Sequence, residues 1–210
     1  MILDDGTGNL NGNILVDNGG SIVSFWGDGI RAIQHDASNT GNLTVHSSGP
    51  ITSGYSAGIW AESSGSGNVT VTTTSGGTIN AGYGPYAEGV AGIYAVSNNT
   101  GTGSVSVDAR GNITTGSPYG YSYGGPGIFA AAQNEFSDGD VSVTAGNVTS
   151  IGYAMYSNPV MTSAIFASAY GTGDVRVDTL SGTTAYSSSG YANYAAALGG
   201  GNVTVVSNGS

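Results

Sequence analysis

The chain has 210 residues, of which 38 are glycine and only 8% are charged. Three arginines stand against thirteen acidic residues, which gives a net charge of −10 and excludes a basic surface for nucleic acid or for an anionic membrane. The absence of cysteine excludes disulfides and thiolate metal ligands. No apolar run reaches the ~18 residues of a membrane-spanning helix, so we expect no membrane insertion by these residues.

The remaining sequence is a rotation of three short motifs, each typical of a β-strand. The first motif, G-[NSD]-[VL]-x-V, has a degenerate copy at 13–16 and recurs at 41–45, 67–71, 103–107, 139–143, 173–177 and 201–205. The second follows a glycine-containing corner at 50–52, 78–80, 112–114 and 147–149. The third, G-I-x-A, occupies 29–32, 58–61, 92–95 and 127–130, with degenerate copies at 163–167 and 193–196.

Copies of the first motif are spaced by 26, 36, 36, 34 and 28 residues. Within each strand, apolar and polar residues alternate, so one face of every strand is predicted to point inward. A single unit cannot bury that face, but units stacked on one another form a continuous core. We therefore predict one all-β domain over residues 1–210, a right-handed parallel β-helix (β-solenoid) with three short strands per coil and about six to seven coils. Strict left-handed hexapeptide coils would not tolerate the variable spacing.

The motifs GIYA, GNVTV and GxI in rotation resemble the β-helical passenger domains of bacterial autotransporters and related type V secreted adhesins. The resemblance extends from about Gly8 to Ser207. It implies a non-catalytic stalk that is secreted or lies on the outer cell surface of a bacterium and is usually adhesive. Its partner would be a host or cell-surface glycan or protein.

The two ends of the sequence bear on whether the chain is part of a longer protein. Residues 1–5 lack the features of a signal peptide, and residues 205–210 stop just inside a new coil without an amphipathic cap. We expect the chain to be an excerpt of a longer protein. The alternative is self-association through uncapped ends, which would build an extracellular filament, because a bare coil offers unpaired strand edges.

The variable position of G-I-x-A forms the first candidate binding surface. It is predicted to place Trp60, Tyr94, Phe129 and Phe166 in an outward row, with Arg31 before them and Ala195 as the last member. An exposed aromatic row could bind sugar faces or a partner protein. The other interpretation is that the long loops before each strand fold over the row.

Tyrosines gather in the segments that lead into the same strand, with Tyr119, Tyr121 and Tyr123 the densest group. Tyrosine with glycine and serine is typical of adaptable binding loops. The alternative interpretation is that these rings only fill the corners of the coils.

A polar column precedes the valines: Asn13, Asn42, Asn68, Ser104, Asp140, Asp174 and Asn202. Stacked side chains of this kind are expected to bond to each other along the axis. Asp140 and Asp174, with Asp138 and Asp178 nearby, have the oxygen ligands that Ca²⁺ prefers. Arg176 could neutralise this cluster instead, and the calcium-binding nonapeptide is absent, so we predict no metal site and no cofactor.

Catalysis is not expected either. Asp17, Asp108 and Asp178 share one column but are separated by His46, Thr72 and Thr144, so they do not form the close carboxylate pair of a polysaccharide-cleaving enzyme. An ice-binding face is a weaker alternative. The outward row that would form it is broken by two serines and an arginine: Thr44, Thr70, Ser106, Ser142, Arg176 and Thr204.

Overall fold

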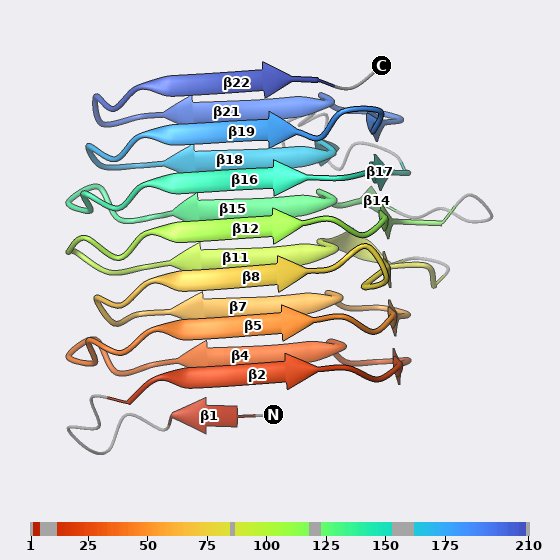
Figure 1. The fold of residues 1–210 in the computed structure, drawn as a ribbon, viewed down its shortest axis with the longest axis horizontal. Helices are drawn as coiled ribbons and strands as arrows, with labels where there is room; N and C mark the ends of the chain where they lie inside the picture. The colour runs from red at the N-terminus through yellow and green to blue at the C-terminus, as the bar shows by residue number, and fades with distance from the viewer. Residues whose placement is uncertain (1, 5–11, 85–86, 118–122, 153–161, 209–210) are drawn as a thin grey trace.

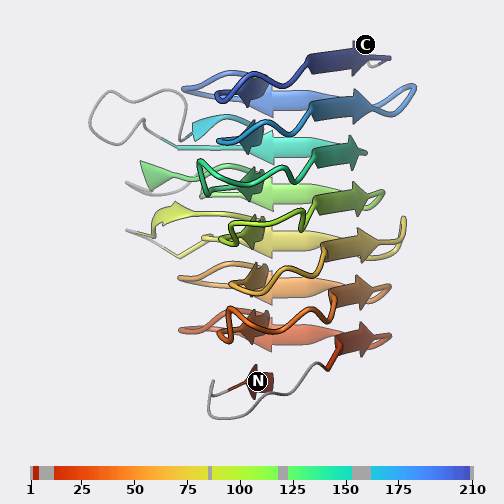
Figure 2. The same cartoon turned by 90° about the vertical axis from the view of Figure 1, so that its left-hand side faces the viewer.

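The computed structural model describes residues 2–4, 12–84, 87–117, 123–152 and 162–208. In these residues the regular structure consists of β-strands, which lie above one another in successive coils (Figures 1 and 2). All pairings between strands are parallel, and they form three long sheets and one short two-stranded ladder. The predicted all-β parallel solenoid is therefore confirmed.

We name the three sheets after their strands. The valine sheet contains β2 (Ile14–Asn18), β5 (Leu43–Ser47), β8 (Val69–Thr73), β12 (Val105–Ala109), β16 (Val141–Ala145), β19 (Val175–Thr179) and β22 (Val203–Ser207). The short-strand sheet contains β3 (Ile22–Ser24), β6 (Ile51–Ser53), β9 (Ile79–Ala81), β13 (Ile113–Thr115), β17 (Val148–Ser150) and β20 (Ala185–Ser187). The aromatic sheet contains β1 (Ile2–Asp4), β4 (Ile30–Gln34), β7 (Ile59–Ser63), β11 (Ile93–Ser97), β15 (Ile128–Ala132), β18 (Ile165–Ala169) and β21 (Asn193–Ala197).

Each coil takes one strand from each sheet in the order valine, short-strand, aromatic. Equivalent motif residues pair directly between coils, as Val69 does with Val105 and Val105 with Val141. Two sheets of seven strands and one of six agree with the prediction of six to seven coils of three strands. The right-handed winding stays a prediction.

The core lies inside the coils, where the inward residues of all three sheets meet. In the coil that contains β8, the side chains of Val69, Val71 and Ile79 have no exposed surface. The strands alternate as expected, because the inward residues of β8 are buried while Thr70 and Thr72 are half-buried on the outer face. Stacking like residues on like therefore gives one continuous apolar cluster along the solenoid.

Gly58 shows why glycine precedes isoleucine in the third motif. A Cβ atom at this position would lie 2.3 Å from Cγ2 of Ile79 and 2.7 Å from the carbonyl oxygen of Gly92 in the next coil. Both distances are far below van der Waals contact, and one of the two atoms belongs to the backbone. The glycine is therefore needed for the close approach of the corner to the core isoleucine.

Two features of the fold were not predicted. β1 pairs with β4 and adds a strand to the aromatic sheet before the first recognisable motif. The two coils with 36-residue spacing each carry one extra short strand, β10 (Glu88–Val90) and β14 (Tyr123–Gly124), and these two strands pair with each other. The longer spacing is thus used to build a small ladder beside the aromatic sheet.

Candidate functional site

The predicted aromatic row exists on the outer face of the aromatic sheet. Trp60 pairs with Tyr94, Tyr94 with Phe129, and Phe129 with Phe166 in the strand register. Their ring centroids are separated by 4.2, 5.1 and 4.6 Å in the same order, and the last two pairs are within 8° of parallel. The distances follow from the ~4.8 Å spacing of neighbouring strands, which brings side chains of successive coils into contact.

The two ends of the row differ in how well they were predicted. Arg31 stands at one end as expected, with its guanidinium carbon 5.4 Å from the centre of the Trp60 ring. At the other end the prediction of Ala195 is wrong, because Phe166 pairs with Tyr194 and their centroids are 5.1 Å apart. Asn193 occupies the position of the core isoleucine in this coil, because it pairs with Ile165. The outward position of the G-I-x-A motif is therefore Tyr194, one residue before the predicted Ala195.

The middle of the row is buried. Phe129 and Phe166 are only 6% and 5% exposed, and they pack with Val96, Ala131 and Ala91 into a second apolar cluster outside the coils. Trp60 and Tyr94 remain half-buried. The two phenylalanines are therefore covered, whereas the tryptophan and the tyrosine are covered only in part. Cover by the long loops before each strand stays a prediction, because residues 118–122 and 153–161 of these loops lie outside the described residues.

This second cluster was missed from the sequence, although a signal for it is present. β15 reads IFAAA and β18 reads IFASA, so alternation of apolar and polar residues is lost in both. A continuous apolar strand is typical of a strand that is buried on both faces. The five residues of each of these strands are indeed buried.

Stacking also decides which part of each ring a ligand could reach. Because the rings of the row lie one above another along the solenoid, the faces of Tyr94, Phe129 and Phe166 are each covered by neighbouring rings. Trp60 lies between Tyr94 and the guanidinium of Arg31. From Trp60 to Phe166 the row therefore presents ring edges, not open ring faces, to a binding partner.

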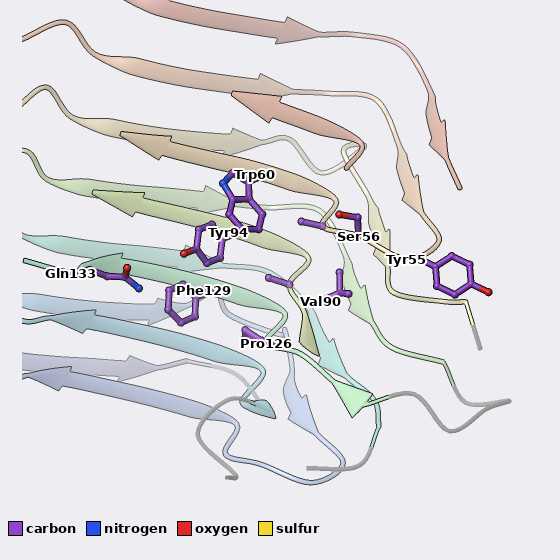
Figure 3. A pocket seen from close by; sticks show the side chains of 10 residues that line it. Tyr55, Ser56, Trp60, Val90, Tyr94, Pro126, Phe129 and Gln133 are labelled. Atoms are coloured by element: carbon purple, nitrogen blue, oxygen red, sulfur yellow. The ribbon is translucent and has the colours of Figure 1, made fainter. Parts of the chain in front are cut away.

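A pocket of about 440 Å³ lies against these edges, within the usual size range of ligand pockets. Figure 3 shows the rings of Trp60, Tyr94 and Phe129 one above another, with Val90 and Pro126 on one side and Gln133 on the other. Val90 ends β10 and Pro126 follows β14, so the short extra ladder supplies one wall. The remaining lining residues come from the corner before β7, namely Tyr55, Ser56 and Ala57, and from Ala91.

Glu62 is a charged group held beside the row by two hydrogen bonds. The Trp60 indole nitrogen donates a hydrogen bond of 2.9 Å to one Glu62 oxygen, and the Asn98 side chain donates one of 2.8 Å to the other. Burial first, and then the Glu62 carboxylate, raise the pKa of the Tyr94 phenol above its ordinary value. The Tyr94 hydroxyl therefore stays protonated at neutral pH.

A second aromatic group, which the sequence did not reveal as a site, lies in the corner between β3 and β4. The Trp26 ring stacks on Tyr55 of the next coil with centroids 4.7 Å apart and planes 16° apart, and Phe25 packs edge-on against both rings. Trp26 is 75% exposed and Phe25 is 52% exposed. The signal was the consecutive pair Phe25-Trp26 in a corner where the next coil has Gly54-Tyr55.

The tyrosine-rich corners are only partly visible. Tyr119 and Tyr121 lie outside the described residues, and so does the side chain of Tyr123, whose backbone starts β14 and pairs with Glu88. Of the other corner tyrosines, Tyr83 and Tyr191 are 39% and 50% exposed. The role of Tyr119, Tyr121 and Tyr123 as a ligand surface stays a prediction.

The polar column before the valines forms a ladder, but its bonds differ from those expected. The Asn42 side-chain oxygen accepts a hydrogen bond of 2.9 Å from the backbone N–H of Asn68, and the Asn68 oxygen accepts one of 3.0 Å from Ser104. The pattern runs through every member of the column: Asn13, Asn42, Asn68, Ser104, Asp140, Asp174 and Asn202. The predicted bonding from side chain to side chain occurs, among these contacts, only where the Asn202 amide donates to the Asp174 carboxylate. The first six side chains instead each accept a hydrogen bond from a backbone N–H directly before a strand of the next coil, where the chain turns.

The acidic residues on the outer face of the valine sheet are engaged locally. The carboxylate of Asp17 lies 2.8 Å from the His46 ring, that of Asp108 lies 3.1 Å from Arg110, and that of Asp178 lies 2.7 Å from Arg176. The proximity of Asp108 raises the pKa of the Arg110 guanidinium. In the described part of the chain, no three histidine, aspartate or glutamate side chains gather as metal ligands would.

The threonine row behind the ice-binding alternative is in register but interrupted. Thr44 pairs with Thr70, Thr70 with Ser106, and Ser106 with Ser142, whose hydroxyls are 3.2 Å apart. Arg176 then follows in the same column. The long Arg176 side chain, paired with Asp178, breaks the flat face that ordered water would need.

Helices long and apolar enough to cross a bilayer are not found among the described residues. The chain was also compared with protein-family models, with curated proteins and with solved structures. None of the three comparisons finds a match, so the geometry described above is what bears on function.

Proposed function

We propose that the protein is a non-catalytic β-helical stalk of the autotransporter-passenger type, secreted by a bacterium or exposed on its outer surface, with a structural and adhesive role. The observation that carries this proposal is the pair of side-chain ladders that run along the solenoid. One links backbone and polar side chains from Asn13 to Asn202, and the other stacks side chains from Arg31 to Tyr194. Both join each coil to the next in addition to the sheets, as a stiff extracellular spacer requires.

The arrangement of the acidic residues supports a role without catalysis. Asp17, Asp108 and Asp178 are each paired with a histidine or arginine neighbour. In the strand register, Thr144 stands between Asp108 and Asp178, and His46 and Thr72 stand between Asp17 and Asp108. Carboxylates that are engaged and interleaved in this way do not have the arrangement of an acid–base pair.

The partner surface is expected on the side of the molecule that carries the aromatic sheet and its corners. There the edges of Trp60 and Tyr94, the wall from β10 and β14, and the exposed Trp26 lie on neighbouring coils. Solenoids commonly bind through the loops of one side. A host or cell-surface glycan or protein is the partner that fits an extracellular stalk.

Adhesion is the first test. Beads coated with the full chain should adhere to host epithelial cells or to glycan-coated surfaces more strongly than beads coated with albumin. The matched control is the Trp60→Ala, Tyr94→Ala double variant, which removes the pocket edges. Absence of adhesion by the intact protein, together with hydrolysis of a polysaccharide by it, would sink the proposal.

Location is the second test. An antibody raised against the chain should label intact, unpermeabilised cells of the organism that encodes it, or detect the protein in the culture medium. Signal that appears only after permeabilisation would contradict a surface or secreted role.

A filament subunit, in which copies of the chain stack end to end, is the second candidate function. The regular joining of coils favours it, because each coil meets the next through the same parallel sheets and the same polar ladder, and a coil of a second copy could be added in the same way. Sedimentation velocity should then show oligomers that grow with concentration and that Val205→Lys dissolves. A stable monomer at high concentration would contradict this candidate.

A further inference from the structure

The pocket over the edges of Trp60, Tyr94 and Phe129 lies inside the stack of coils. Its lining residues belong to the three consecutive coils that contain β7, β11 and β15. The coil of β4 precedes these three, and the coils of β18 and β21 follow them. The pocket is therefore shaped by contacts between neighbouring coils and not by either end of the stack.

The hollow exists because the corners of the three coils differ in length. The corner before β7 covers residues 54–58, whereas the corners before β11 and β15 cover 82–92 and 116–127. The two longer corners contain β10 and β14, and their ladder supplies the wall with Val90 and Pro126. Residues 54–58 form no such strand, so a space of about 440 Å³ remains beside the ladder and in front of the ring edges (Figure 3).

The pocket is apolar on one side and polar on the other. Ala57 and Ala91 are only 4% and 6% exposed, and with Pro126 they give the side next to the corners an apolar surface. Gln133 and the hydroxyl of Tyr94 lie on the opposite side (Figure 3). An apolar pocket with a few polar groups is the usual design of a site for one small group.

The ring edges decide which chemical group can fill this space. An aromatic ring carries a slight positive charge at its edge and a slight negative charge on its face. Because the rings of the row are stacked on one another, the pocket meets the positive edges of Trp60, Tyr94 and Phe129. A favourable occupant therefore presents an apolar surface with a slight negative charge. The face of another aromatic ring is such a surface.

Sugars and ions fit these edges less well. A sugar ring packs on aromatic side chains through C–H groups, whose slight positive charge matches ring faces and not ring edges. A cation meets the same positive edges. An anion is opposed by the carboxylate of Glu62, which is held 2.9 Å from the Trp60 indole nitrogen, and by the net charge of −10. A neutral aromatic group is the occupant that these charges favour.

The chain itself shows the geometry of such a contact. Phe25 packs edge-on against Trp26 with centroids 4.9 Å apart and planes 88° apart, and against Tyr55 with centroids 5.3 Å apart and planes 77° apart. A ring that enters the pocket with its face toward the row forms the same T-shaped arrangement. Gln133 can then bond to a phenol hydroxyl or to the backbone beside the entering ring, because its amide both donates and accepts.

We propose that the pocket over Trp60, Tyr94 and Phe129 binds an aromatic side chain of a partner protein, whose ring face meets the edges of these three rings. The proposal deepens the adhesive function given above by favouring a protein over a glycan at this pocket. It rests on that function for its biological role.

The test uses ring-current shifts, which only an aromatic ligand causes. Protons that lie over the face of an aromatic ring move to lower chemical shift. The chain contains only Trp26 and Trp60, so Trp60→Phe identifies the ring protons of Trp60 in a sample with ¹³C-labelled aromatic rings. A capped tripeptide with tyrosine between two glycines should move these protons to lower chemical shift saturably, while those of Trp26 move less. The same tripeptide with leucine should bind about two- to tenfold more weakly and cause no such shift.

Variants complete the experiment. Tyr94→Leu removes one ring edge and should weaken binding of the tyrosine tripeptide several-fold, whereas Tyr94→Phe keeps the edge and should bind within about twofold of the wild type. Val90→Ala shortens the wall without touching the row and should also weaken binding. Tyr186→Leu, which removes a tyrosine that is 52% exposed on β20, is the matched control and should bind like the wild type. Thermal unfolding by circular dichroism checks that each variant is folded.

Four results would overturn the proposal. These are the absence of a shift with the tyrosine tripeptide, equal affinity for the leucine tripeptide, binding that persists in both Tyr94→Leu and Val90→Ala, and saturable movement of the Trp60 protons by cellotriose alone. Self-association of the chain that Tyr94→Leu abolishes would make a second copy the occupant and would also contradict a partner protein.

Failure of this proposal can be told apart from failure of the adhesive function. Treatment of host cells with protease should remove the adhesion of coated beads, and Tyr94→Leu beads should adhere less than wild-type beads. If adhesion survives both changes, the pocket is not the site and adhesion stands. If the tyrosine tripeptide binds at Trp60 but beads do not adhere to any cells, the pocket stands and the adhesive function is wrong.

Discussion

The long aromatic row and the short stack of Trp26 on Tyr55 are built from the same kinds of side chain, yet they leave different parts of their rings open. In the row, rings from Trp60 to Tyr194 cover one another and the two phenylalanines are almost fully buried. In the short stack, Trp26 keeps one face uncovered. The row thus resembles a piece of core placed outside the coils, whereas the short stack is largely exposed to solvent at Trp26 and Phe25.

The difference arises from where each group lies in the coil. The row stands on strands, whose register repeats in each of these coils, so an aromatic residue in one coil meets an aromatic residue in the next. The short stack stands in a corner, where length and residue type change from coil to coil, and Gly84 in the third coil ends it. Rings on strands therefore continue from coil to coil, whereas rings in corners stack only where neighbouring corners both carry one.

The largest expected effect comes from breaking the row at its buried centre. Phe129→Ala removes a ring that is 6% exposed and stacked on both sides, so it should lower the free energy of unfolding by about 3–5 kcal/mol. Urea unfolding followed by circular dichroism measures the change. Phe136→Ala, at a 71% exposed position, is the control and should cost less than about 0.5 kcal/mol. Equal losses in the two variants would contradict the division drawn between buried row and exposed corner.

A smaller effect is expected where the short stack is closed. In Gly84→Ala the new Cβ would lie 2.6–2.8 Å from three atoms of the Tyr55 ring, so the ring must shift. We expect a loss of about 1–3 kcal/mol, as for other overpacked sites. The indole N–H signal of Trp26 should move while that of Trp60 keeps its position. An unchanged Trp26 signal would show that Tyr55 does not position this tryptophan.

Removal of the open ring should cost little stability. Trp26 is 75% exposed and touches the rest of the molecule mainly through Tyr55 and Phe25, so Trp26→Ala should lower the free energy of unfolding by less than about 1 kcal/mol. Denaturant titration of the variant beside Phe129→Ala makes the comparison direct. A loss as large as that of Phe129→Ala would mean that the corner ring is structural.

The smallest effect is confined to alkaline pH. The pKa of Tyr94 is raised by burial and then by Glu62, so above the ordinary tyrosine value of about 10 the unfolded chain releases this proton before the folded one does. Stability that is fully present below that pH is therefore lost as pH rises toward the higher, folded-state value. In Tyr94→Phe this contribution is gone, and unfolding midpoints measured from neutral to strongly alkaline pH should fall less steeply than in the wild type. Parallel slopes for the two proteins would contradict the shift.

The fold could be predicted almost completely because its determinants are local and repeated. Val69, Val105 and Val141 stand at equivalent places in a motif, and stacking requires equivalent places to pair. The alignment of the G-I-x-A motif with the strands is wrong only in the last copy, where the repeat is degenerate. Asn193 replaces the core isoleucine, and for that reason Ala195 was placed in the row instead of Tyr194.

The candidate site was less predictable because it depends on contacts between corners. That Trp60 and Tyr94 are neighbours follows from the motif, but the closure of their faces follows from ring orientation, which no spacing encodes. The stacking of Trp26 on Tyr55 joins two corners of different sequence, SFWGDG and SGYSAG. Contacts between corners of different sequence can be identified only from the three-dimensional arrangement of the coils.

The polar ladder also gives the rod a direction. At every step the acceptor is a side chain of the earlier coil and the donor is a backbone N–H of the later coil, from Asn13 with Asn42 to Asp174 with Asn202. A coil that joins the C-terminal face of an existing stack therefore meets a side-chain oxygen already in position. A coil that joins the opposite face must bring that oxygen itself. The two faces of each coil are therefore chemically different along this ladder, because one face offers side-chain oxygens and the other offers backbone N–H groups.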